Sequence, residues 1–296
     1  MMEFINFYLI PGLVLGSIYA LGAIGITLTF SILRFANFAH GETMLLGVYI
    51  TYSLVQVSGL HPLLVLPFAA ILTVIVVLGI DRAFYKPFRS SPTIMVVIAS
   101  FGMMLMVRSM VQFIWGVQLK GMMPGIQRPM VFFDSLRLSP KHMLIMAAAI
   151  VLMLAVHYLL SRTKIGKAMR AMSDSPELAR LTGIDTERVI RMTWIVGGAL
   201  ATAAGVFLAI DTHIDTNMGF KMLLPMFAAA ILGGIGRPFG AVAGGLIIGI
   251  AEELSSYPWI GMEPLLNPGY KAGVAFAIMI GMLLWRPSGL FKGKVF

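Results

Sequence analysis

The sequence predicts an all-α, polytopic helical membrane protein with about eight to nine transmembrane helices, in a single domain that covers residues 1–296. Three observations lead to this fold class. Hydrophobic residues make up 58% of the chain and charged residues only 12%, and the mean hydropathy is +0.90. Apolar runs of ~20 residues, the length that crosses a bilayer as a helix, recur along the chain. Lys and Arg gather between these runs, as is typical of the ends of membrane helices.

Nine apolar runs are candidates for membrane spans. They cover residues 7–33, about 43–59, 62–80, 93–115, 142–160, 189–210, 220–235, 241–254 and 270–285. The first run places Gly12, Gly16 and Ala20 at four-residue spacing, which predicts the close approach of another helix. The stretch 220–254 contains Pro225 and is broken at a Gly-rich turn, so it is either two short spans or a re-entrant pair.

Basic residues predict the orientation of the chain, because loops rich in Lys and Arg stay on the cytoplasmic side. The richest loop, Arg162 to Arg191, carries eleven of the 35 charged residues. Counting spans outward from this loop places Asp81 to Arg89 and the C-terminal tail in the cytoplasm, and the N-terminus outside. The connector from Gly116 to Lys141 is an exception, and longer loops follow the rule less well. No Lys or Arg precedes Arg34, so we expect no cleavable signal peptide.

The cytoplasmic loop contains the signals of a short, capped helix. Asp174 or Ser175 can accept hydrogen bonds from the free N–H groups at its start. Pro176 suits the first turn, and the carboxylate of Glu177 favours the positive end of the helix dipole. Gly183 can end the helix in a left-handed conformation, and the next membrane helix then follows. The sequence therefore predicts a short helix presented to the cytoplasm, with an ordinary solvated loop as the alternative.

The ionisable residues at the start of the second span are candidates for a translocation path or gate. Asn37, His40 and Glu42 lie where the chain enters that span. Charged groups at membrane depth are costly, so they tend to face a cavity or a protein partner. The alternative is structural, since Asn37 and the groups after it can cap a helix near the interface. Glu252 and Glu253 end another span, and we expect them at the interface rather than buried.

Catalytic chemistry is not predicted. The chain has no cysteine, which excludes disulfides and thiolate metal sites. Its histidines stand singly, so no metal-ligand cluster is expected. Residues 233–237 resemble a phosphate-binding loop only in composition and lack its Gly-Lys-Ser/Thr ending. We therefore expect that the protein is not an enzyme and has no cofactor and no catalytic residue. Active transport would then need energy from another subunit or an ion gradient. The basic residues lie at span ends, so nucleic acid is not an expected partner.

Several stretches resemble one family of transport proteins. Asn37-Phe38-Ala39-His40-Gly41-Glu42, followed by Met44-Leu45-Leu46-Gly47-Val48-Tyr49, is similar to the early signature of branched-chain amino acid ABC-importer permeases. The likeness is to the H-type (LivH-like) subunit more than to the M-type (LivM-like) one. The run from Gly233 to Glu252 and the closing Arg286-Pro287-Ser288-Gly289-Leu290 also resemble the family. The resemblance covers nearly the whole chain and implies an ABC-importer permease in a bacterial inner (plasma) membrane.

The resemblance also implies a role for the cytoplasmic loop. Glu177-Leu178-Ala179, with Gly183 four residues on, is similar to the coupling motif of ABC-importer permeases, although Leu178 departs from the usual Ala and the hydrophobic-Pro ending is absent. Residues 162–191 would form a coupling loop that docks on an ATPase. Its coupling residues would be Asp174, Glu177, Leu178, Ala179 and Gly183.

The partners implied by the family are a second, M-type permease subunit, two cytoplasmic ATP-binding subunits and an external substrate-binding protein, assembled in the lipid bilayer. The mechanism would be alternating access driven by ATP hydrolysis in the partner subunits. Urea and short-amide permeases share much of the signature, so they are a rival substrate class. A self-sufficient ion-coupled carrier or channel that uses His40 and Glu42 is a rival of a different class.

Overall fold

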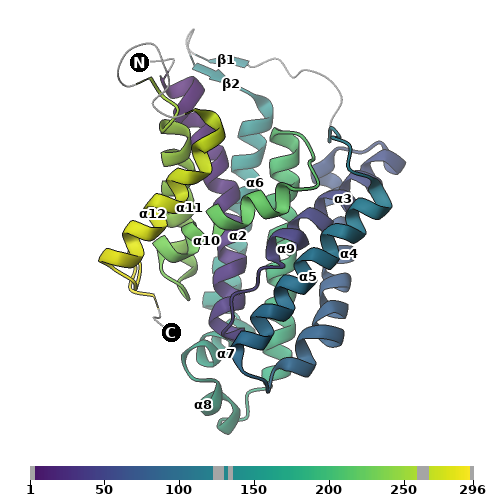
Figure 1. The fold of residues 1–296 in the computed structure, drawn as a ribbon, viewed down its shortest axis with the longest axis vertical. Helices are drawn as coiled ribbons and strands as arrows, with labels where there is room; N and C mark the ends of the chain where they lie inside the picture. The colour runs from purple at the N-terminus through teal and green to yellow at the C-terminus, as the bar shows by residue number, and fades with distance from the viewer. Residues whose placement is uncertain (1–3, 123–129, 133–135, 259–266, 294–296) are drawn as a thin grey trace.

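The computed structural model describes residues 4–122, 130–132, 136–258 and 267–293 and has α-helices as its main elements (Figure 1). The elements in chain order are η1 (Ile5–Leu9), α2 (Ile10–Leu33), α3 (His40–Ser58), α4 (Pro62–Ile80), η2 (Asp81–Tyr85), η3 (Lys86–Phe88), α5 (Thr93–Trp115), β1 (Met130–Phe132), β2 (Leu136–Leu138), α6 (Pro140–Arg162), α7 (Lys164–Asp174), α8 (Pro176–Leu181), α9 (Thr186–Asp211), α10 (Met218–Gly233), α11 (Pro238–Leu254), η4 (Pro268–Tyr270) and α12 (Lys271–Trp285). In Figure 1, α7 and α8 lie at one end of the long axis, and the N-terminus and β1–β2 lie at the other.

The helix count is roughly consistent with the predicted eight to nine spans. Within the described residues, five helical segments are long and apolar enough to cross a membrane: Ile5–Leu33, Pro62–Phe88, Thr93–Trp115, Pro140–Arg162 and Thr186–Asp211. The other four candidates are α3, α10, α11 and α12, which are 19, 16, 17 and 15 residues long. At 1.5 Å per residue, the three shortest helices are about 22–26 Å long, slightly less than the ~30 Å hydrocarbon core.

The centre of the bundle is built on α2 and α9, which are largely buried, whereas α4, α5 and α6 are largely exposed. The predicted small-residue surface of α2 packs on α11. A Cβ added to Gly16 would lie 2.8 Å from the Leu246 Cα, and one added to Gly245 would lie 2.5 Å from the Ala20 N. Two glycine-lined helices can therefore approach backbone to backbone, as the spacing predicts. Antiparallel to α2, α11 covers much of the same depth, whereas α10 starts inside the bundle, where Gly219 lies against Gly41.

The close packing of α2 on α11 also corrects one expectation. Glu252 was expected at the interface, but it is buried and its Oε2 accepts a hydrogen bond of 2.6 Å from the Tyr19 hydroxyl. The glycine contacts draw α11 against α2 so closely that this carboxylate is covered. Glu253 points to a different neighbour and forms an ion pair of 2.8 Å with Lys271.

The long connector between α5 and α6 has structure that the sequence did not predict. β1 and β2 form an antiparallel pair in which Val131 lies opposite Arg137. A separate bridge joins the backbone of Lys120 to that of Ile214, so the connector also touches the segment that precedes α10. Strands of three residues are too short to show a period-two pattern in sequence.

Candidate functional site

The helix α3 begins inside the bundle rather than at its end. α2 stops at Leu33, and Arg34 takes a left-handed conformation with φ 61°. The chain then runs non-helically to His40, whose ring packs on Gly25, where an added Cβ would lie 2.7 Å from the His40 Cε1. Gly25 lies eight residues before the end of α2, so the chain returns by about 12 Å before α3 starts. Membrane segments broken in this way are typical of transporter binding sites, where half-helix ends face the substrate path.

Asn37 takes the structural role that the sequence left open. Its Oδ1 accepts hydrogen bonds of 3.1 Å from the backbone N–H of Ala39 and from the hydroxyl of Tyr85. These bonds fix the turn that leads into α3 and tie it to η2. Asn37 is buried, so both of these bonds form away from solvent.

Glu42 is fully buried and paired with an arginine from another helix. Its exposed fraction is 0%, and its Oε1 accepts hydrogen bonds from the Nε of Arg108, at 3.0 Å, and from Nη2. The guanidinium of Arg108 also lies over the ring of Phe220, with Cζ 5.1 Å from the centroid. The pair thus joins α3, α5 and the first turn of α10. The sequence analysis missed Arg108, although an arginine inside an apolar run is itself a signal of a functional or paired site.

Two helix starts meet beside this ion pair. Gly41 in α3 and Gly219 in α10 are in close backbone contact, since a Cβ added to Gly219 would lie 2.5 Å from the Gly41 carbonyl oxygen and 3.1 Å from the Glu42 Oε2. The positive ends of two helix dipoles therefore face a buried carboxylate. Among the described residues, neither the Glu42 Oε2 nor the His40 Nε2 has a hydrogen-bond partner. His40 and Glu42 thus lie in the first turn of α3 inside the bundle, whereas Asn37 contacts η2.

The predicted short helix of the charged loop is α8. Ser175 caps it, since its Oγ accepts a hydrogen bond of 3.4 Å from the Leu178 N–H. At the other end, Gly183 has φ +82°, and the N–H groups of Gly183 and Ile184 donate to the carbonyls of Arg180 and Ala179, each at 3.0 Å. This pattern is a Schellman motif, for which a left-handed residue is required. The predicted end at Gly183 is confirmed.

The surface of α8 is unusually apolar for a charged loop. Leu178 is 63% exposed and Leu181 is 83% exposed, whereas Ala179 is buried. Asp174 and Glu177 are exposed beside them. The candidates Asp174, Glu177 and Leu178 thus lie together on an open face at one end of the molecule, with Ala179 on the packed side and Gly183 at the end of the helix.

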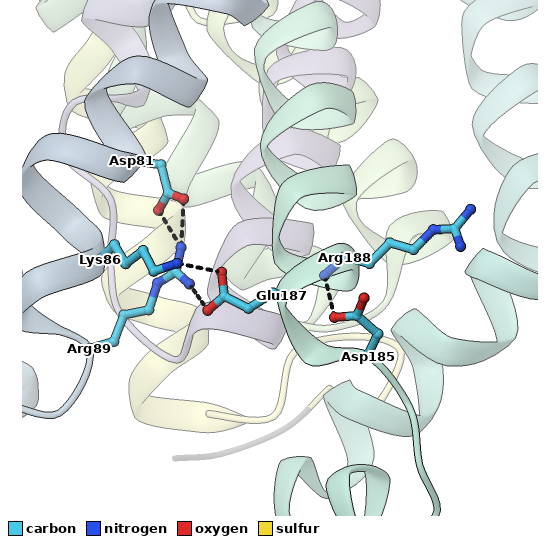
Figure 2. Close-up of polar contacts among 6 residues, drawn as sticks. All are labelled: Asp81, Lys86, Arg89, Asp185, Glu187 and Arg188. Carbon is cyan, nitrogen blue, oxygen red and sulfur yellow. Dashed lines mark hydrogen bonds and ion pairs between the residues drawn. The ribbon is translucent and has the colours of Figure 1, made fainter.

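A cluster of ion pairs connects this end to the rest of the bundle (Figure 2). Arg89 lies between Asp81, with N···O distances of 2.5 and 2.7 Å, and Glu187, at 2.7 Å. Lys86 adds a second contact to Glu187 at 3.3 Å. Glu187 belongs to the first turn of α9, where Asp185 caps the helix by accepting a hydrogen bond of 3.0 Å from the Arg188 N–H. The α4–α5 connection is therefore fastened to the element that follows α8.

Comparison with known proteins decides the family. A family model described as the permease component of the branched-chain amino acid transport system matches residues 8–283. The chain belongs to this family. The permease is 33% identical to the high-affinity branched-chain amino acid transport system permease protein BraD of Pseudomonas aeruginosa, over 95% of its own length and 94% of BraD. It is 34% identical to LivH of Escherichia coli K12, a permease protein of the same kind of system, over 94% of its length and 92% of LivH.

A solved structure agrees with the fold. PsaBC from Streptococcus pneumoniae in complex with Fab superposes with a TM-score of 0.53 and 14% identity, over 95% of this chain and 91% of that one. The predicted all-α, multi-pass membrane fold and the resemblance to branched-chain amino acid permeases are confirmed. The permease is a transport component rather than an enzyme, as its family and relatives are. Within the described residues, no group of three His, Cys, Asp or Glu could hold a metal ion.

Proposed function

We propose that this chain is the membrane-spanning permease subunit of an ABC importer for branched-chain or other aliphatic amino acids. The observation that carries the proposal is the family match across residues 8–283, together with relatives whose names specify branched-chain amino acid transport. In such an assembly a second M-type permease would complete the path.

The exposed face of α8 supports coupling to an ATPase. Leu178 and Leu181 are apolar side chains held in water on a helix whose start and end are both fixed by capping bonds. Rigid apolar anchors surrounded by polar residues are typical of the centres of protein interfaces. Two ATP-binding subunits on this side would place the charged loop and the C-terminus in the cytoplasm and the N-terminus outside, where a substrate-binding protein would dock.

The cluster around Glu42 is the proposed gate. The Glu42–Arg108 pair joins helices that belong to different parts of the bundle, and the broken start of α3 lies against it. Movement of α5 or α10 would strain or open this pair, which suits a switch between outward-facing and inward-facing states. Because Arg108 neutralises Glu42, this carboxylate is poorly suited to be the free cation site that a self-sufficient ion-coupled carrier would need.

The test is reconstitution with defined partners. The tagged chain is purified from its native membrane in mild detergent, and the proteins that accompany it are identified. The recovered assembly is placed in liposomes with the binding protein outside and ATP inside, and uptake of labelled leucine is compared with uptake of labelled urea. We expect leucine uptake that needs ATP and withstands an uncoupler. Uptake by the chain alone, abolished by an uncoupler, would overturn the proposal, and uptake of urea in place of leucine would reassign the substrate.

A further inference from the structure

A groove of about 870 Å³ on the outside of the bundle is separate from the proposed gate. It lies between α6 and the start of α11, over the second half of α2, and ends at α7 and the C-terminal tail. Its volume is within the ~300–1,000 Å³ typical of small-molecule sites. Two apolar residues that line it are strongly exposed: Leu154 at 61% and Phe239 at 62%. The groove therefore opens at the surface of the bundle.

The groove changes chemistry along its length. On α6, Ile150, Met153 and Leu154 line one part of it, and His157 and Ser161 continue the same helix face toward α7. From position 150 to position 161 the helix rises by about 16 Å, which is roughly half of the ~30 Å hydrocarbon core. On α2, the lining likewise passes from Ile24 and Leu28 to Ser31. The whole lined stretch of α6, apolar and polar parts together, thus has about the length of one leaflet, and its polar side chains lie toward the end of the helix.

Three basic residues stand around the polar end. Arg170 from α7, Arg237 before α11 and Lys292 from the tail line the groove, are exposed, and form no ion pair with the residues that the structure describes. Asp174 is the acidic residue in the lining, so the excess charge is positive. The three basic residues come from separate elements, so the fold brings them together and not a basic stretch of sequence.

We propose that this groove binds one anionic phospholipid, with an acyl chain along α2 and α6 and the phosphate among Arg170, Arg237 and Lys292. The apolar lining, the groove's length along α6 of about one leaflet and the basic rim all match an amphiphile with a negative head group. Basic pockets between membrane helices are known to hold such head groups, and each Lys or Arg near an anionic membrane surface contributes about fivefold in affinity. The groove shares no residue with the Glu42 cluster, but its polar end includes Asp174 of the proposed coupling loop.

The first test measures retained lipid. The full transporter is purified from its membrane in mild detergent, and the ratio of phosphatidylglycerol to phosphatidylethanolamine is measured by mass spectrometry. The triple variant R170Q/R237Q/K292Q should lose at least tenfold of the retained phosphatidylglycerol. The matched control R162Q/K164Q/K167Q removes three exposed charges from α6 and α7 that do not line the groove, and should retain it. Equal retention in both variants would overturn the proposal.

The second test does not depend on the triple variant folding. Leu154→Trp places a fluorophore in the groove, and Val151→Trp places one on the same helix outside it. The fluorescence of the four native tryptophans is measured on the parent protein and subtracted from that of each variant. Two liposome samples are compared, one with brominated phosphatidylglycerol and one with brominated phosphatidylcholine. The first should quench the fluorescence of the tryptophan at position 154 more strongly than the second, and both should quench the tryptophan at position 151 equally. Equal quenching at both positions would contradict the proposal. A cross-link to a partner protein from a photoreactive amino acid placed at position 154 of the full transporter would also overturn it and show a subunit interface instead.

Discussion

Neutralising the buried pair between Glu42 and Arg108 gives the sharpest test of the candidate gate. Arg108→Gln leaves a fully buried carboxylate without its counter-charge, whereas Glu42→Gln leaves a guanidinium that is 18% exposed and still lies over the ring of Phe220. The charge that remains is more deeply buried in the first variant. Arg108→Gln should therefore be the more damaging of the two.

The structure gives the size of the effect. Breaking a buried ion pair by removing one partner costs about 3–5 kcal/mol, because the other charge stays buried and alone. For larger domains a change of 1 kcal/mol moves the melting temperature by about 2–4 °C, so a loss of about 3 kcal/mol gives a shift of roughly 6–12 °C for Arg108→Gln. The double variant E42Q/R108Q buries no net charge, and its loss should be smaller than the sum of the single losses by at least about 2 kcal/mol.

The assay is apparent thermal unfolding of the purified assembly in one detergent, with leucine uptake measured on the same preparations. The matched control is the Glu253–Lys271 pair between α11 and α12. Its side chains are 17% and 27% exposed, and the variants E253Q and K271Q should shift the melting temperature less. If the pair also belongs to the gate, the double variant should regain stability but not uptake. Additive losses, or shifts no larger than those of the control pair, would refute the reasoning.

Three further predictions concern the end of the molecule that carries α8. Gly183→Val forces a β-branched residue to φ +82°, at a cost of about 1–2 kcal/mol, and should lower uptake per ATP hydrolysed while the amount in the membrane is unchanged; normal coupling would remove Gly183 from the mechanism. Leu181→Asp should weaken ATPase binding at least tenfold in a pull-down titration, with the melting temperature unchanged, because the side chain is 83% exposed. Arg89→Gln should destabilise the fold by about 3 kcal/mol, because it leaves the buried Asp81 unpaired. Glu187→Gln should cost at most about 1 kcal/mol, because it removes a half-exposed carboxylate, and equal shifts in melting temperature would contradict this order.

Local rules account for the parts of the structure that the sequence predicted. Apolar runs place the spans, and the capping residues place α8, since Ser175 starts it and Gly183 ends it with the required φ. Each of these features depends on residues within a few positions of one another. Hydropathy over the length of one span and the hydrogen-bonding preferences of the backbone are therefore enough to predict them.

Features that depend on contacts across the chain were missed or misplaced. The sequence places His40 at the lip of a span, but it does not show that the chain turns back along α2 until His40 reaches Gly25. Glu252 was expected at the interface, yet the glycine contacts between α2 and α11 bury it against Tyr19. The partner of Glu42 lies 66 residues away in the sequence. The sequence signal for it is the isolated charge of Arg108 within an apolar run.

The two polar clusters are connected through one helix, and this connection is the least visible feature of the sequence. The end of α8 is fastened by its Schellman bonds to the turn before α9, and Glu187 in the first turn of α9 holds Arg89, which is 98 residues distant. Arg89 lies four residues before α5, and α5 carries Arg108 to Glu42. Covalent bonds, hydrogen bonds and ion pairs therefore run without a break from α8 to the start of α3. In the proposed mechanism a displacement of α8 would reach the gate along this route, and the half-exposed contact at Glu187 would be its weakest step.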